Sequence, residues 1–168
     1  MFSLFSVLRF VHIIAGILWA GGAILMNLII GPAIGATGDT GRQFAAHLIS
    51  KTPFTRYMLA AGTITVLAGS YLYGVNSNWF RSGWMMTGPG IGFGIGAAAG
   101  ILALIFGFMI GSTNNAIAAL GAQIQGKPSE AQMSAMQALR RKQVTVTVAN
   151  TICIIIAISF MAVARLLG

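Results

Sequence analysis

Four stretches of this chain are apolar over lengths that match the thickness of a lipid bilayer. A transmembrane helix needs about 20 consecutive, mostly apolar residues. Only 7% of the 168 residues are charged, whereas about a quarter is usual in a soluble domain. A backbone in lipid must also satisfy its own hydrogen bonds, which favours helices. The sequence therefore predicts one all-α integral membrane domain over residues 1–168, a bundle of four transmembrane helices at about 4–30, 54–75, 89–111 and 143–167.

Two short sequences mark the expected ends of these spans. Gly31-Pro32 is typical of a helix end and predicts that the first span stops there. Thr52-Pro53 combines a good N-cap with proline at the first helical position, and predicts the start of the second span.

The connections between the spans carry helical patterns of their own. Residues 40–51 in the first loop have apolar side chains on one side and polar side chains on the other, which predicts a short amphipathic helix. In the third loop the helical pattern continues through residues 112–142, interrupted by a turn at 126–128. Its apolar residues repeat at helical spacing: Met133, Met136 and Leu139. This predicts a helical hairpin extension, which either closes on itself or docks a partner subunit.

Lysine and arginine residues predict the orientation. The first and third loops hold seven of them, and the opposite side holds three, namely Arg9, Arg81 and Arg165. Because positive residues favour the cytoplasmic side, we expect both chain termini on the outer side. Trp79, Phe80 and Trp84 in the second loop fit an outer interfacial belt. The expected location is the inner (cytoplasmic) membrane of a bacterium.

The shortage of acidic residues excludes several kinds of chemistry. Asp39 and Glu130 are the only carboxylate side chains, so a paired-carboxylate mechanism, a Ser-His-Asp triad or a carboxylate-rich metal site is not expected. No catalytic residue is predicted, and an enzymatic role is not favoured. The net charge of +8 comes from residues at the ends of apolar runs, which indicates contact with lipid rather than with nucleic acid.

His12 is the clear case of an ionisable side chain inside a predicted span. Such groups are costly in a bilayer and therefore suggest a function, and imidazole binds metals, including haem iron. Arg9 lies one turn closer to the outer surface, where it can meet a haem propionate. Gly16 and Trp19 continue the same face and offer a small residue and a flat aromatic wall. The alternative is structural: His12 hydrogen-bonds a neighbouring helix, and Arg9 extends to the interface.

If His12 holds a cofactor, the candidate that these residues indicate is one haem, with His12 as the metal ligand. His47 cannot be a second ligand from the same chain, because residues 12–30 alone span roughly 27 Å of helix. Copper is less favoured, because the nine methionines are scattered and form no ladder.

Small and polar residues predict how the helices associate. Gly92, Gly96 and Gly100 fall at every fourth position of the third span, a pattern that permits close helix approach. Three uses of this glycine face remain open: packing against another helix of the same chain, space for a flat macrocycle, or contact with other membrane subunits or a second copy of the chain. Asn27 and Asn150 lie in the inner halves of their spans, where they could bond to each other across a helix interface, and both are interpreted as structural.

The first span also resembles that of a known family. His12, six residues, Trp19, the small pair Gly21-Gly22 and a proline after the span resemble the CopD-like superfamily of small four-helix membrane proteins. The likeness extends over most of the chain, through Ser129-Glu130, Arg140-Arg141, Asn150 and Met161-Ala162.

What the resemblance implies is a b-type haem held from the first helix, as in some members of the superfamily, whereas others are linked to copper by name only. Of the family's residues, His12 and Trp19 carry over to this chain. HemJ-type protoporphyrinogen oxidases, which are distantly similar, have a Pro-Arg element after this helix. Here Pro32 is followed by Ala33, so their oxidase activity is not carried over.

Two functions remain as hypotheses. The first is a membrane redox protein that binds one haem b near the outer face, with a role in electron transport. The second is a non-catalytic accessory or scaffold subunit of a larger membrane complex.

Overall fold

The computed structural model describes residues 3–167, and every regular element in that range is a helix. The elements are α1 (Leu4–Leu25), the π-helical turn η1 (Met26–Ile30), α2 (Gly31–Ala36), α3 (Gly38–Lys51), α4 (Phe54–Asn76), η2 (Gly83–Met86), α5 (Gly88–Gln123), α6 (Glu130–Val163) and η3 (Ala164–Leu166). Four helical segments are long and apolar enough to cross a membrane. The all-α, four-span architecture is therefore confirmed. The outermost residues of the predicted domain, 1, 2 and 168, lie outside the described range.

The first span continues beyond its predicted end. An apolar helical segment runs from Leu4 to Ala36, over 33 residues. The Gly31 N–H bonds to the carbonyl of Met26, five residues back, in a π turn. Pro32 then falls in the first turn of α2, where its missing N–H is tolerated. A wider turn before the proline thus keeps the chain helical where the sequence suggested a stop.

The start of α4 is built from the predicted residues, displaced by one position. The Thr52 hydroxyl accepts a hydrogen bond from the Phe54 N–H at 3.3 Å, and Pro53 is the N-cap. Thr52 therefore supplies the capping oxygen, as expected of a residue that precedes a helix.

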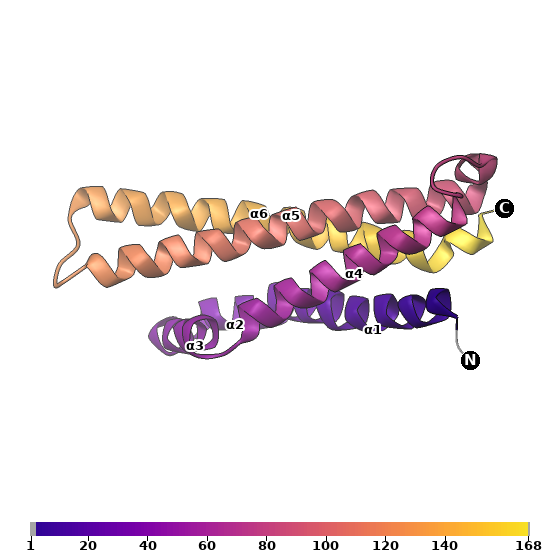
Figure 1. The fold of residues 1–168 in the computed structure, drawn as a ribbon. Coiled ribbons are helices and arrows are strands. Elements are labelled where there is room, and N and C mark those ends of the chain that lie inside the picture. The colour runs from indigo at the N-terminus through magenta and orange to yellow at the C-terminus, as the bar shows by residue number, and fades with distance from the viewer. Residues whose placement is uncertain (1–2, 168) are drawn as a thin grey trace.

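The helices pack as two pairs, and α4 runs obliquely from one pair to the other (Figure 1). Helix α1 packs along α4, α5 packs along α6 over most of its length, and α4 joins the two pairs by packing against α5. Helices α1 and α6 touch only over a short stretch. Both described ends of the chain lie at one end of the molecule, and α3 lies towards the other (Figure 1).

The α5–α6 hairpin extends past the α1–α4 pair (Figure 1). Helix α5 has 36 residues and α6 has 34. At about 1.5 Å per residue each is roughly 50 Å long, whereas a bilayer core is about 30 Å thick. The distal part closes on itself: the Gln143 amide donates to Asn114 Oδ1 at 2.6 Å, and Met136 and Leu139 are half-buried. Met133 stays 46% exposed.

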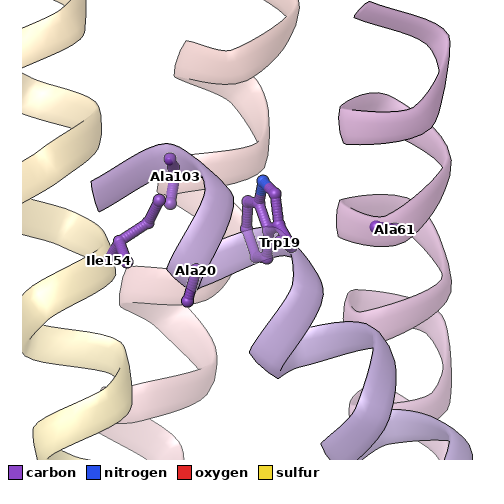
Figure 2. Close-up of a cluster of buried hydrophobic side chains, with 6 residues drawn as sticks. Trp19, Ala20, Ala61, Ala103 and Ile154 are labelled. Atoms are coloured by element: carbon purple, nitrogen blue, oxygen red, sulfur yellow. The ribbon is translucent and has the colours of Figure 1, made fainter. Parts of the chain in front are cut away.

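Small residues let all four spans meet at one level (Figure 2). Trp19 and Ala20 of α1 are buried there with Ala61 of α4, Ala103 of α5 and Ile154 of α6. Trp19 is the only large aromatic ring in this cluster, and the alanines around it allow the helix backbones to approach closely.

Asn27 and Asn150 each bond to another residue rather than to each other. Asn27 donates to Thr151 Oγ1 at 2.7 Å, and Asn150 donates to the carbonyl of Ala103 at 2.7 Å. Asn27 thus ties η1 to α6, and Asn150 ties α6 to α5. The first span does reach α6 at this level, but Thr151 faces η1 there, whereas the neighbouring Asn150 bonds to α5.

A tight left-handed turn follows α4. Asn78, Trp79 and Phe80 have φ values of 48°, 54° and 68°, a conformation that costs roughly 1–2 kcal/mol for each L-residue. Ser77 is fully buried at its base, donates to the Gly74 carbonyl and accepts from the Phe80 N–H, both at 3.1 Å. The Trp79 ring lies edge-on to Tyr71 at 5.8 Å. Hydrogen bonds and aromatic packing therefore hold the turn in place.

Replacing Ser77 by alanine is expected to lower the free energy of unfolding by about 1 kcal/mol, because it removes the partner of the part-buried Phe80 N–H and one of the two hydrogen bonds to the Gly74 carbonyl. An SDS unfolding titration of the purified protein measures this change. Ser112→Ala is the matched control, since that hydroxyl also bonds to a carbonyl three residues back but is exposed. Equal effects of the two substitutions would contradict the structural role of Ser77.

Candidate functional site

His12 lies at the contact between α1 and α4, with one ring nitrogen bonded. Its Nδ1 is 2.8 Å from the carbonyl oxygen of Thr65. A carbonyl can only accept, so Nδ1 carries the hydrogen, and in the neutral ring Nε2 carries the lone pair. Within residues 3–167, Nε2 has no hydrogen-bond partner and is not buried. The imidazole is therefore oriented by α4 and keeps one nitrogen available.

A glycine on α4 makes room for this ring. A Cβ atom at Gly69 would lie 2.7 Å from His12 Cε1 and 2.9 Å from Nδ1. Such distances are far below van der Waals contact, so only glycine permits the observed ring position. One turn further along, a Cβ at Gly16 would lie 3.5 Å from Thr65 Cγ2, an ordinary contact.

Trp19, two turns after His12 on α1, packs against α4 in the same manner. Its indole is 7% exposed, and a Cβ at Gly62 would lie 2.8 Å from its Cε2. Gly62, Thr65 and Gly69 thus form a shallow groove on α4 into which Trp19 and His12 of α1 fit. His12, Gly16 and Trp19 share one face as predicted, and this face is filled by α4.

The other predicted residues lie apart from this contact. Arg9 is exposed one turn before His12 and forms no ion pair within residues 3–167. His47 is exposed on α3, towards the opposite end of the molecule (Figure 1). No group of three potential metal-binding side chains occurs in the described part of the chain. Within the described residues, His12 is therefore not part of a three-residue metal site built from His, Cys, Asp and Glu.

The glycine face of α5 is used largely inside the chain. A Cβ at Gly92 would lie 3.0 Å from Ala164 Cα, and one at Gly96 would lie 3.0 Å from Met161 Cε. Both glycines face the C-terminal part of the α6–η3 segment, so packing within the chain is the alternative that the structure realises for them. A Cβ at Gly100 would meet no atom within 4 Å.

Comparisons with known proteins leave this site without a relative. No family model, curated protein or solved structure matches the chain. The resemblance to CopD-like proteins therefore stays a prediction, and the argument about function depends on the geometry.

Sequence reasoning did not find the partners of His12. Gly62, Thr65 and Gly69 follow a small-residue spacing of three and four, the same signal that was recognised in α5. The hydrogen bond to Thr65 has no sequence signal at all, because its acceptor is a main-chain carbonyl.

Proposed function

We propose that this chain is a small integral membrane protein that holds one haem b through His12 and acts in membrane redox chemistry. The observation that carries the proposal is the hydrogen bond from Nδ1 to the Thr65 carbonyl. Metal-binding histidines commonly donate their second ring N–H to a carbonyl, which fixes the tautomer and the ring orientation. The unbonded Nε2 is the nitrogen that such a ligand uses.

The residues around His12 fit this group in part. The donor chemistry of Nε2 suits haem iron, which would supply one-electron transfer when bound. Arg9 is exposed and free of an ion pair within residues 3–167, so it is available to a propionate. Gly16 and Trp19 do not wall a macrocycle, because α4 covers them. A ligand is therefore held by His12 and Arg9 at the periphery of the α1–α4 pair.

The experiment that tests the proposal is an optical spectrum of the purified protein, before and after titration with haemin. We expect a Soret band and a reduced α-band that disappear in His12→Gln. Glutamine retains an N–H donor for the Thr65 carbonyl but no imidazole. His47→Gln is the matched control and is expected to keep the spectrum. A protein that stays colourless and gives no Soret shift with haemin would sink the proposal.

The second candidate function is a non-catalytic accessory subunit of a larger membrane complex. The α5–α6 hairpin that projects past the α1–α4 pair favours it (Figure 1), and Met133, near the start of α6, is 46% exposed. A colourless preparation that co-purifies with larger subunits in fixed stoichiometry supports this function. A coloured protein that purifies alone supports the first.

The proposed setting is the bacterial inner membrane, with both termini on the outer side. The seven lysines and arginines near α3 and along the hairpin support this orientation. Reporter fusions at the C-terminus and at the hairpin turn measure it. At the C-terminus, a reporter that works only in the periplasm is expected to be active, and one that works only in the cytoplasm is expected to be inactive.

A further inference from the structure

A polar cavity opens at the start of α4, remote from His12. It has a volume of about 670 Å³ and lies where the end of α3, the first turn of α4 and a residue of α5 come together. Lys51 and Arg56 contribute its charges, Asn115 reaches it from α5, and Ile49 and Leu59 form apolar parts of the wall. The described lining contains no acidic residue.

The two cations of this cavity are not neutralised within the chain. Among residues 3–167, the ion pair that forms is that of Arg42 with Asp39. Lys51 and Arg56 are exposed and have no carboxylate partner there. The cavity therefore has two positive charges available to an anion.

Backbone donors face the same place. Helix α4 has 23 residues and begins at Phe54, whose N–H is capped by the Thr52 hydroxyl. The next two N–H groups, of Thr55 and Arg56, have no acceptor within the described residues, as is usual in a first turn. Free N–H groups and the positive end of the helix dipole favour an anion beside the two side-chain cations.

The cavity also lies at the level where a membrane span begins. Helix α4 is itself one of the four candidate spans, so its first turn is expected near the lipid headgroups, and Leu59 one turn later near the acyl chains. We propose that this cavity binds the phosphate of an anionic phospholipid, with Lys51 and Arg56 holding the headgroup. A basic pocket between spans suits this ligand, and the apolar wall favours a lipid over a soluble phosphate.

The test is a lipid-binding measurement by native mass spectrometry on the full chain in neutral detergent. The probes are phosphatidylglycerol, phosphatidylcholine and inorganic phosphate. We expect phosphatidylglycerol to bind in preference to phosphatidylcholine. Lys51→Gln with Arg56→Gln is expected to weaken phosphatidylglycerol binding roughly thirtyfold. This is the fold-change in affinity that corresponds to the combined binding free energy of two cations near an anionic headgroup.

The matched control is Lys127→Gln with Lys142→Gln, which removes two charges from residues outside the cavity. We expect it to change binding by less than about threefold. If both double variants weakened phosphatidylglycerol binding equally, the lipid would be attracted by the overall positive charge of the protein, and the proposed site would be overturned. Displacement of the lipid by millimolar inorganic phosphate would overturn the lipid as its ligand. Circular dichroism of each variant checks that the helices are intact.

Discussion

Replacing Gly62 by valine is expected to separate α1 from α4 and to lower the free energy of unfolding by about 3 kcal/mol. A Cβ at this position would lie 2.8 Å from Trp19 Cε2 and 3.1 Å from Leu104 Cδ1. The indole is a rigid ring in the central cluster where all four spans meet, so it cannot move aside without disturbing the other helices. An SDS unfolding titration measures the loss.

Gly21→Val is the control for Gly62→Val. A Cβ at Gly21 meets no atom within 4 Å, so an effect within roughly 0.5 kcal/mol is expected. If Gly62→Val were equally harmless, the fit of Trp19 into the α4 groove would be contradicted.

Replacing Gly69 by valine is expected to push the His12 ring away from α4 and to break its bond to the Thr65 carbonyl. The added atoms would overlap Cε1 and Nδ1, which lie 2.7 and 2.9 Å from the Cβ position. We expect a stability loss of about 2–3 kcal/mol from overpacking and the lost hydrogen bond together. Nitrogen-15 NMR of labelled histidine reports the tautomer directly, and the Nδ1–H signature of His12 is expected to weaken.

Gly107→Val serves as the control for Gly69→Val, because a Cβ there also meets no atom within 4 Å. An unchanged His12 signal in Gly69→Val would mean that α4 does not orient the ring. Haemin binding is then compared between the two variants. Because Gly69 is not itself a ligand and contacts the His12 ring, weaker haemin binding in Gly69→Val alone would show that the orientation of this ring matters for binding.

The number of spans could be predicted from the sequence because apolar length is a strong signal. Boundaries were harder. Pro32 normally indicates a helix end, yet the π turn at Met26–Ile30 accommodates it, and no residue pattern announces such a turn. The parts of α5 and α6 that extend past the α1–α4 pair were predictable as a hairpin, because their apolar residues keep the helical period.

The candidate site was only partly predictable. Helical periodicity predicts that His12, Gly16 and Trp19 lie on one face of the first span. In the structure, these three residues do share one face of α1, which packs against α4. What covers that surface depends on the rotation of α4 about its axis, which the sequence does not specify. Rotation about the helix axis also decides the asparagine contacts: Thr151 of α6 faces Asn27, whereas the neighbouring Asn150 bonds to α5.

The length of the α5–α6 hairpin places Lys127, near its tip, far from Lys51 and Arg56 at the start of α4. Helix α5 has 36 residues, or about 54 Å at about 1.5 Å per residue, so its far end stands roughly 24 Å beyond a hydrocarbon core of about 30 Å. The headgroups fill about 6 Å of this distance, so the far end lies about two Debye lengths from the lipid charges at physiological salt. Lys127 near the tip is thus screened from the lipid surface and is free to meet soluble molecules. Lys51 and Arg56, at the start of α4, remain within the electric field of the headgroups.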